Sequence, residues 1–217
     1  MGSSIPKQFL TIDGRQVIEY PIETFCNHPA IDEVAVVVHP DWRAHLQEVI
    51  ERNHWEKLTK VIDGGSERYM SSINAIMAYI DYQNDTNLLL HDAARPWVSA
   101  EIIDRVVEAL GPNEAVGVAV PSTDTVWEVH PDIDANYASR FIARTPERRL
   151  MWRAQTPQAF RLPLLRDAYQ RALQDPQFAA TDDCGVVRKY MPGIKICVVE
   201  GEERNKKITF QEDLLNQ

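Results

Sequence analysis

The sequence has few cysteines, no long apolar run and no excess of positive charge, and each shortage excludes a class of protein. The three cysteines, Cys26, Cys184 and Cys197, are far apart and odd in number, which indicates neither a disulfide framework nor a metal site. No apolar run approaches the ~18 residues that a membrane-spanning helix needs. The first residues also lack the apolar stretch of a secretory signal. We therefore expect a cytoplasmic protein in a reducing compartment, with no membrane partner.

Acidic residues outnumber basic ones, because 32 Asp and Glu stand against 23 Lys and Arg in 217 residues. The formal net charge of −9 and the pI near 5.2 argue against a general surface for nucleic acids. A small anionic ligand is still compatible with this charge. Its site would have to be a local concentration of basic side chains within an acidic protein.

Two nucleotide-binding motifs are also missing. The chain contains no G-x-G-x-x-G and no Walker-type G-K-[ST], so a nicotinamide dehydrogenase and a P-loop enzyme both lose their main support. No Ser/His/Asp or Cys/His arrangement has supporting context, and the six histidines form no pair with metal-ligand spacing. The sequence therefore predicts no metal ion held by protein side chains alone.

Apolar strands alternate with amphipathic helices along most of the chain. This order is typical of an α/β protein with a mostly parallel sheet and right-handed crossovers. The length suits a single domain that spans residues 1–217. We expect strands at 33–38, 58–62, 86–90, 115–120 and 195–199, and helices at 40–53 (capped by Asp41), 66–80 (capped by Ser66), 100–110, 162–173, 181–190 and 211–215.

Residues 121–154 interrupt this alternation. The segments 125–130 and 137–143 alternate like hairpin strands, with Pro131-Asp132-Ile133-Asp134 as the turn between them. Such an arm is too polar to form a core by itself, so it is either a flap over a site or a dimerisation element. The segment Gln155–Phe160, which follows the arm, reads on composition as a polar loop.

The stretch Leu88–Pro96 (LLLHDAARP) is the strongest local indication of a site. Its three leucines predict a strand covered on both faces, and Pro96 turns the chain out of the sheet. Asp92 and Arg95 would then lie at the carboxyl end of a strand, where open α/β sheets bind ligands. Taken alone, a strand followed by a solvated loop with an internal ion pair explains the stretch equally well.

Other residues fall near the same expected edge of the sheet. The turn Gly64-Gly65-Ser66 allows close approach of a ligand to the backbone, and a helix N-terminus after it favours an anion. Arg68 and Lys207 also fall near carboxyl ends of predicted strands. Each basic residue is, by itself, more often a solvated surface side chain. Their shared position favours a phosphate site.

Taken together, short motifs in chain order resemble one known family. They resemble the 2-C-methyl-D-erythritol 4-phosphate cytidylyltransferases and, equally, their relatives the ribitol 5-phosphate cytidylyltransferases. The resemblance runs from Met1 to the end of the chain, and the order of the motifs makes it specific where any one alone would be weak. The motifs are Pro6-Lys7-Gln8, Asp63–Arg68, His91–Pro96, Asp124-Thr125, Gln155–Phe160, Thr181-Asp182-Asp183 and Asn205–Thr209.

The resemblance implies a Rossmann-like nucleotidyltransferase domain with a protruding β-arm at 121–154 that joins a homodimer. It implies CTP and a polyol phosphate as substrates, with Mg²⁺ bound mainly through the CTP phosphates. An acceptor phosphate oxygen would attack the α-phosphorus and release pyrophosphate without a covalent enzyme intermediate, so catalysis is positioning and charge neutralisation. By this resemblance the catalytic residues are Lys7 and Lys207, the CTP-binding residues are Gly65, Ser66, Ser71, Asp92 and Ala93, and the acceptor-binding residues are Arg95, Thr125, Arg148 and Thr156, with Thr125 or Arg148 reaching from the partner's arm.

Two positions depart from the family pattern. Ser66 stands where the family often has Asp. The family also opens with a strand and a loop of the form L-A-A/G-G-x-G-x-R-M-G, whereas this chain starts at what corresponds to its Met-Gly. Without that first strand, neighbouring strands would expose unpaired edges. We expect a shortened chain or a misplaced start codon, and lower stability and activity than in a form extended upstream.

Three functional hypotheses remain open from the sequence. The first is a cytidylyltransferase that uses 2-C-methyl-D-erythritol 4-phosphate, which the paired alanines of His91–Pro96 favour. The second uses ribitol 5-phosphate and makes CDP-ribitol, to which Val38–Trp42 and Asp183-Cys184 are closer. The third, of another class, is a catalytically impaired nucleotide-binding homodimer, because the Gly-rich loop is missing.

Overall fold

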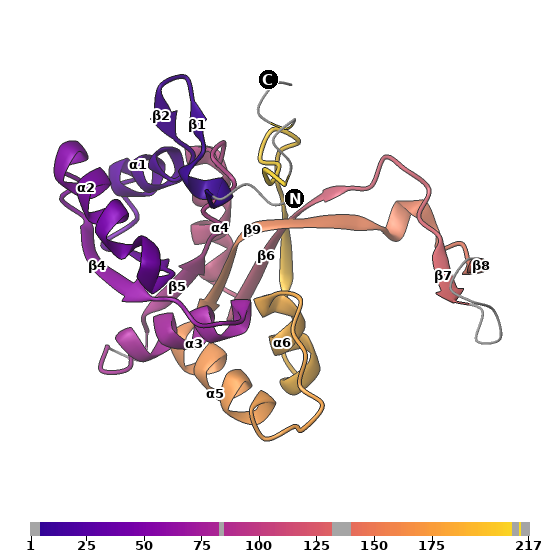
Figure 1. The fold of residues 1–217 in the computed structure, drawn as a ribbon. Coiled ribbons are helices and arrows are strands. Elements are labelled where there is room, and N and C mark those ends of the chain that lie inside the picture. Colours follow the sequence, from indigo (N-terminus) through magenta and orange to yellow (C-terminus); the bar gives the residue numbers. More distant parts are fainter. Residues whose placement is uncertain (1–4, 83–84, 132–139, 210–212, 214–217) are drawn as a thin grey trace.

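The computed structural model describes residues 5–82, 85–131, 140–209 and 213. It confirms the α/β class, with helices on both faces of strands and a long arm that projects from one side (Figure 1). The helices are α1 (Glu19–Asn27), α2 (Arg43–Asn53), α3 (Arg68–Ala78), α4 (Ala100–Leu110), α5 (Leu162–Ala172) and α6 (Asp183–Tyr190), with 3-10 turns η1 (Lys7–Phe9), η2 (Pro40–Trp42) and η3 (Arg148–Leu150). The strands are β1 (Thr11–Ile12), β2 (Arg15–Gln16), β3 (Val34–Val38), β4 (Leu58–Asp63), β5 (Asn87–Leu90), β6 (Ala115–Pro121), β7 (Glu128–Pro131), β8 (Arg140–Arg144), β9 (Trp152–Arg161) and β10 (Cys197–Glu200).

The main sheet has the order β10-β6-β9-β5 and is mixed rather than mostly parallel. β10 runs parallel to β6, but β9 runs antiparallel to both β6 and β5. The reason is the arm: β9 returns directly from it beside β6, and an antiparallel return needs no crossover helix.

β9 corrects the expectation that Gln155–Phe160 is a loop. This segment is the buried centre of the longest strand, bonded to β6 on one side and β5 on the other. Gly117 of β6 pairs with Gln158 and the next residue, Val118, pairs with Gln155, so Thr156 and Pro157 form a bulge. A bulge is one of the few places in a sheet where proline is tolerated. The polar, proline-containing sequence that suggested a loop marks this bulge.

β3 and β4 form a separate, parallel, two-stranded sheet beside β5. Within the described residues, no ladder joins β3 to β5. Among the described residues, β3 and β5 therefore each have one edge without a ladder partner, as expected. Arg68, just after β4, approaches Asp92, just after β5, so the carboxyl ends of the two sheets meet at one edge.

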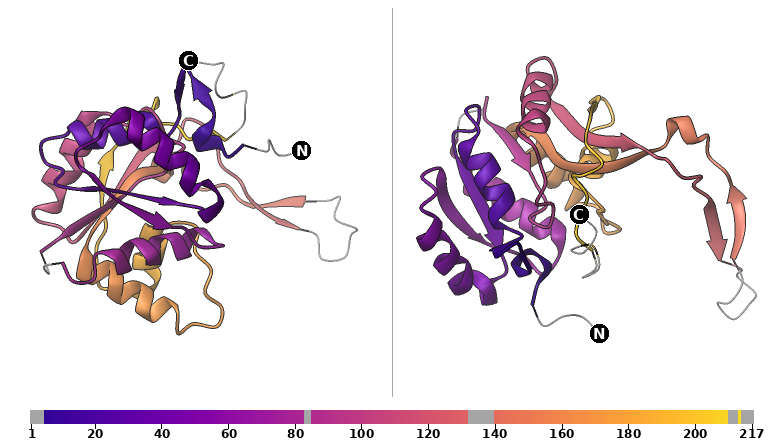
Figure 2. Two further views of the ribbon diagram at one scale, coloured as in Figure 1. Left: turned by 60° about the vertical axis from the view of Figure 1, so that its left-hand side comes forward. Right: turned by 90° about the horizontal axis from the view of Figure 1, so that it is seen from above.

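Apolar side chains from the helices cover the strands on both faces. On one face α3, α5 and α6 pack against Leu88 of β5 and Phe160 of β9. On the other face α4 packs against Val116 and Val118 of β6, and α1 and α2 pack against β3 and β4. The two views of Figure 2 show these layers from the side and from above. The layers leave the carboxyl ends of the strands accessible, which is where the candidate site lies.

Helix starts agree only in part with the expected caps. The helix α4 has the predicted bounds, and the side chain of Ser99, for which no cap was predicted, accepts the Ile102 N–H at its start. Ser66 does not cap α3: its hydroxyl contacts the Met70 sulfur, and the N-cap residue is Glu67. Asp41 does not cap α2 either, because it lies inside the η2 turn that precedes the helix.

The arm is a hairpin of β7 and β8 carried on the extended ends of β6 and β9 (Figure 2, right). Its turn at 131–134 and the expected helix at 211–215 lie largely outside the described residues. Large apolar side chains on and beside the arm are exposed, among them Trp127, Phe141 and Ile142. No helix in the described part of the chain is long and apolar enough to cross a membrane.

Candidate nucleotide site at the carboxyl ends of the strands

Asp92 is the centre of the candidate site, because three cations from separate elements point at its carboxylate. Lys207 Nζ lies 3.1 Å from Asp92 Oδ2, Arg95 Nε lies 3.4 Å from the same oxygen, and Arg68 Nη2 lies 3.9 Å from Oδ1. Burial acts to raise the pKa of Asp92, but Lys207, Arg68 and Arg95 together hold it below its ordinary value. The carboxylate therefore stays ionised, with three cations around it.

The backbone contacts of Arg95 and Ile208 hold this cluster together. Arg95 Nη1 donates to the carbonyl of Asn205 over 2.8 Å, and the Ile208 N–H donates to the carbonyl of Ala94 over 2.8 Å. Ile208 is fully buried, so the loop that carries Lys207 is anchored against the loop that follows β5. Lys207 is thus brought to Asp92 by a fixed backbone.

His91 links the loop after β5 to the bulge of β9. Its Nδ1 lies 3.0 Å from Thr156 Oγ1, and its Nε2 lies 3.1 Å from the carbonyl oxygen of Arg95. The Asp92 N–H donates to the same Thr156 hydroxyl over 3.0 Å. Burial lowers the pKa of His91 to about 4. The neutral ring can thus accept the Thr156 proton and donate to Arg95, which fixes the loop without adding charge.

Arg68 is held from behind by a buried acid that the sequence did not single out as functional. Arg68 Nη1 lies 2.9 Å from Asp183 Oδ2, and Asp183 is fully buried. Tyr169 donates its hydroxyl to the other oxygen of Asp183 over 2.7 Å. Burial and the charge of Asp183 raise the pKa of Tyr169, so the phenol keeps its proton. Asp183 therefore positions the guanidinium at the edge of the cluster.

The turn between β4 and α3 lies beside Arg68. The Gly64 N–H donates to the carbonyl of Val38, and the Gly65 N–H donates to Ser71 Oγ over 3.2 Å. A Cβ on Gly65 would lie 2.1 Å from the Cβ of Met70, so only glycine fits here. The close turn presents Ser71 and the start of α3 toward the site, while Ser66 is exposed.

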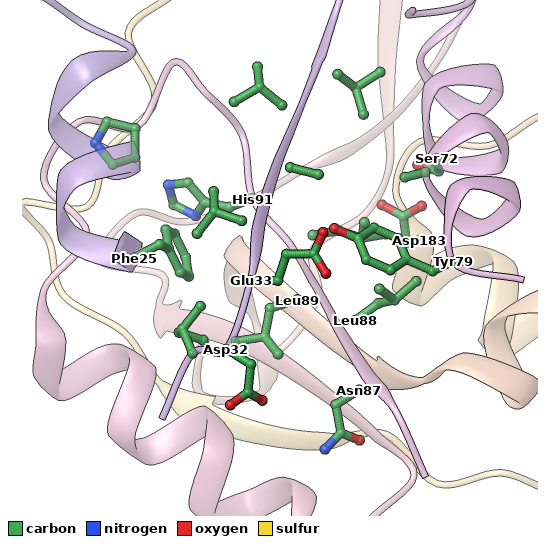
Figure 3. A pocket seen from close by; sticks show the side chains of 18 of the residues that line it. Phe25, Asp32, Glu33, Ser72, Tyr79, Asn87, Leu88, Leu89, His91 and Asp183 are labelled. Carbon is green, nitrogen blue, oxygen red and sulfur yellow. The ribbon is translucent and has the colours of Figure 1, made fainter. Parts of the chain in front are cut away.

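Two cavities meet at these residues. A small one of about 180 Å³ is lined by Arg68, Asp92, Arg95, Ala154, Gln155, Thr156, Gln158, Thr181, Asp182 and Lys207. A larger one of about 650 Å³ extends from Arg68, Ser71, Asp92 and Ala93 down between β3 and β5. Figure 3 shows the side chains that line the larger cavity, including His91 and Asp183. Fixed cations around the small cavity suit phosphate groups, because they neutralise negative charge with little rearrangement.

The structure brings together most of the predicted site residues. Arg95, Thr156 and Lys207 line the small cavity with Asp92, and Ser71 and Ala93 line the large one. Gly65 and Ser66 form the neighbouring turn. Lys7 is exposed in η1, two residues before Phe9, which packs with Val38 and Ala93 at the same sheet edge. In the described residues, Lys7 lines neither of these two cavities.

Thr125 and Arg148 are not brought to the site within one chain. Both lie exposed on the arm, where Arg148 contacts the carbonyl of Thr123 at 3.5 Å. Asn205, by contrast, has a clear role that sequence analysis missed: its Nδ2 donates to the carbonyl of Thr156 over 2.8 Å from a fully buried position. Its place at the head of the Asn205–Thr209 motif was the available signal.

Comparisons with known proteins agree on one family. The family model described as 2-C-methyl-D-erythritol 4-phosphate cytidylyltransferase matches residues 1–217. The enzyme of that name from Thermobifida fusca is 43% identical over 214 residues, which cover 99% of this chain and 85% of the relative. A bifunctional ribulose 5-phosphate reductase/CDP-ribitol pyrophosphorylase, Bcs1, from Haemophilus influenzae is 35% identical, and the match covers 99% of this chain but 44% of that protein.

Solved structures give the same result. The crystal structure of 4-diphosphocytidyl-2C-methyl-D-erythritol synthase from Anaerococcus prevotii superposes with a TM-score of 0.84 at 31% sequence identity. The match covers 99% of this chain and 89% of that one. The Francisella tularensis 2-C-methyl-D-erythritol 4-phosphate cytidylyltransferase has a TM-score of 0.80 at 30% identity, with 97% and 91% coverage.

Proposed function

This chain belongs to the 2-C-methyl-D-erythritol 4-phosphate cytidylyltransferase family, and we propose on that premise that it transfers the cytidylyl group of CTP to this polyol phosphate. The observation that carries the proposal is the convergence of Arg68, Arg95 and Lys207 on Asp92 in one small cavity. Such a cavity fits the phosphates of two anionic substrates held side by side, in a protein whose net charge is −9.

The reaction needs positioning and charge neutralisation rather than a protein nucleophile. An oxygen of the acceptor phosphate forms a bond to the α-phosphorus of CTP as the bond from that phosphorus to the bridging oxygen breaks, and pyrophosphate leaves. Lys207 and Lys7 would bind the α-phosphate and its developing charge, and Arg95 and Thr156 would bind the acceptor phosphate. Gly65, Ser66 and Ser71 would contact the cytosine, with Asp92 and Ala93 beside the ribose. Cations in fixed positions stabilise the negative charge that develops in the transition state, because they do not have to rearrange as it forms.

Mg²⁺ is part of this proposal as a companion of the triphosphate. In the described residues, no group of three or more His, Cys, Asp and Glu could hold a metal ion. Asp92 and Asp182 are the two carboxylates that line the small cavity, and Mg²⁺ in such sites binds one or two carboxylates together with substrate phosphates. These residues fit that arrangement. The ion would neutralise charge on the CTP phosphates, while Lys207 of the chain would orient the α-phosphate.

The arm supports a second part of the proposal, a homodimer. The side chains of Trp127, Phe141 and Ile142 on and beside the arm are exposed, and a single chain leaves them in water. A partner packed on this surface would bring Thr125 or Arg148 of its arm to the acceptor side of the site. This arrangement would explain why both residues lie away from the cavities within one chain.

The test is pyrophosphate release from CTP in the presence of Mg²⁺ and 2-C-methyl-D-erythritol 4-phosphate, with formation of the CDP derivative followed by mass spectrometry. We expect turnover that requires both CTP and the acceptor. CTP binding by calorimetry without any turnover would contradict the enzyme and favour a nucleotide-binding homodimer.

A second acceptor, ribitol 5-phosphate, is favoured by one observation. Bcs1 of Haemophilus influenzae, named for CDP-ribitol, matches nearly the whole of this chain at 35% identity. The higher identity of 43% to the Thermobifida fusca enzyme supports methylerythritol phosphate as the first choice. The same assay with both acceptors decides between them, and turnover with ribitol 5-phosphate alone would reverse this order.

A further inference from the structure

A buried glutamine of β9 holds the loop of residues 201–208, which follows β10 and carries Lys207. Gln155 is 5% exposed. Its Nε2 donates to the carbonyl of Glu202 over 2.8 Å, while its Oε1 accepts from Asn205 Nδ2 over 3.2 Å and from the Glu202 N–H over 3.4 Å. Both polar atoms of this amide are therefore bonded to the loop.

The first residue of the loop allows the backbone to lie directly against this amide. A Cβ on Gly201 would be 2.3 Å from Gln155 Oε1 and 2.8 Å from a methyl carbon of Val118, which is itself buried in β6. The Gly201 N–H donates to the carbonyl of Ala119 over 2.8 Å, so the loop cannot move outward without losing this bond. Glycine at this position is thus explained by the close approach to Gln155.

Asn205 transmits this contact to the residues of the candidate site. It is fully buried, its Nδ2 also donates to the carbonyl of Thr156, and its own carbonyl accepts from Arg95 Nη1 over 2.8 Å. Lys207 lies between Asn205 and Ile208, and the Ile208 N–H is bonded to the loop after β5. The short segment that carries Lys207 is therefore held at both ends, and Gln155 holds the first of them.

We propose that Gln155 is a positioning residue, which acts through Asn205 to hold the ammonium group of Lys207 in the small cavity. The inference rests on the proposed function, in which Lys207 meets the charge that develops on the α-phosphate. Gln155 lines the same cavity, but its amide is already bonded to the loop and is not needed for a substrate. A displacement of about 1 Å in a reacting group can cost about 10²-fold in rate, so this support bears directly on the reaction.

The first experiment removes the amide of Gln155 and measures pyrophosphate release. Gln155→Leu keeps a side chain of similar size but loses every hydrogen bond to the loop. We expect kcat to fall about ten- to hundredfold and KM for CTP to change less than about threefold, because Lys207 acts on charge that forms in the transition state. Gly201→Ala, which displaces the same amide without removing it, should lower kcat in the same direction.

A double-mutant cycle separates positioning from a general loss of structure. If Gln155 acts through Lys207, adding Gln155→Leu to Lys207→Ala should lower kcat by less than a further factor of about two. Asn53→Leu is the matched control, because Asn53 donates to Glu19 and to the carbonyl of Val49 and, among the described residues, lines neither cavity. It should lower the Tm and leave kcat unchanged.

Chemical labelling of Lys207 tests its position without any turnover. The full chain is treated with acetic anhydride in the absence of substrates, and acetylation of each lysine is followed by mass spectrometry. In Gln155→Leu, Lys207 should be acetylated at least about threefold faster, because its amine is no longer held against Asp92. Lys189, which pairs with Asp175 near the end of α6, is the internal control and should react at the same rate in both chains.

Three results would overturn the inference. They are equal acetylation of Lys207 in the two chains, losses that multiply in the double-mutant cycle, and a higher KM for the polyol phosphate at unchanged kcat. The last of these would place Gln155 in contact with the substrate. If the unchanged chain releases no pyrophosphate, the proposed reaction is wrong, and the acetylation of Lys207 decides the positioning role by itself.

Discussion

The ammonium group of Lys207 lies 3.1 Å from Asp92 and faces a cavity that also contains Arg95 and Thr156. If it stabilises the charge that develops on the α-phosphate, Lys207→Ala should lower kcat by roughly 10²–10³ with a smaller effect on folding. Steady-state kinetics and a thermal melt together measure this. Lys206→Ala is the matched control, because Lys206 lies over the ring of Trp97 and does not line the cavity. A near-normal kcat for Lys207→Ala would remove it from this role.

Removal of the buried carboxylate of Asp183 should lower the stability of the fold. Asp183 is fully buried between Arg68 and Tyr169, so Asp183→Ala removes the acceptor of the Tyr169 hydroxyl and leaves Arg68 with only the more distant carboxylate of Asp92. We expect a loss of about 2–4 kcal/mol in the free energy of unfolding, reduced by the part of Arg68 that water can reach. Urea denaturation measures it. Tyr169→Phe, which removes one hydrogen bond, should cost about 1 kcal/mol. Equal losses in the two variants would contradict the charge-pairing role.

His91 makes stability depend on pH. Its pKa in the folded chain is about 4, below the ordinary 6.5, so between these values the unfolded chain binds a proton that the folded chain does not. Stability should therefore fall as the pH decreases from about 6.5 to 4, by no more than about 3 kcal/mol from this residue. Urea unfolding across that pH range, with His91→Gln beside the unchanged chain, measures the effect.

In His91→Gln this part of the pH dependence should disappear. His130→Gln, on the exposed arm, should behave like the unchanged chain. A pH profile that is the same with and without His91 would show that the ring titrates normally in the folded chain.

At the scale of elements, the prediction concerns the arm and its role in forming the proposed dimer. Phe141 is 61% and Ile142 53% exposed on β8, so in a single chain their apolar surface faces water. Phe141→Asp with Ile142→Asp should convert the proposed dimer to a monomer while the Tm of the core changes little, because the described part of the arm adds no side chains to the core clusters. Light scattering after gel filtration measures the mass. Leu173→Asp, an exposed apolar residue at the end of α5, is the control and should remain dimeric.

How far the sequence predicts each element depends on whether its signal is local. α4 was predicted to the residue, because its apolar residues, including Ile102 and Val106, recur at helical spacing. β9 was missed because Gln155 and Gln158 are polar residues buried by distant partners. Gln155 donates to the carbonyl of Glu202, and Gln158 donates to Asp182. Nothing within a short window of sequence reveals such partners.

The same reasoning applies to the site. Asp92, Arg95 and Lys207 were predicted together because each follows a strand, and strand ends meet at one edge. The role of Asp183 depends on Tyr169 and Arg68, which lie on two other helices, so helix capping alone gave it no function. The mixed sheet likewise depends on where β9 inserts, which strand patterns do not determine.

At the scale of the whole molecule, an acidic protein concentrates its cations where the strands end. The chain has a net charge of −9, yet Arg68, Arg95 and Lys207 meet around one carboxylate. The surrounding negative charge disfavours extended polyanions, while the small cavity keeps a short-range attraction for phosphate groups. The fold therefore selects small phosphorylated ligands over nucleic acids.

The divided sheet predicts an uneven stability across the molecule, measurable by amide hydrogen exchange. β6 is bonded on both edges and its residues Ala115–Val120 are buried, so its amides should exchange only through global unfolding. Amides of β3 and β5 that face the larger cavity between these strands have no ladder partner in the described chain and should exchange many-fold faster. β10 is the control for an outer edge strand.

If the amides of β3 and β5 exchange as slowly as those of β6, the larger cavity between β3 and β5 is closed in solution. The half-buried Leu89 and Leu90 would then have to pack against β3 directly. The stability of β3 and β5 would in that case equal the stability of the main sheet.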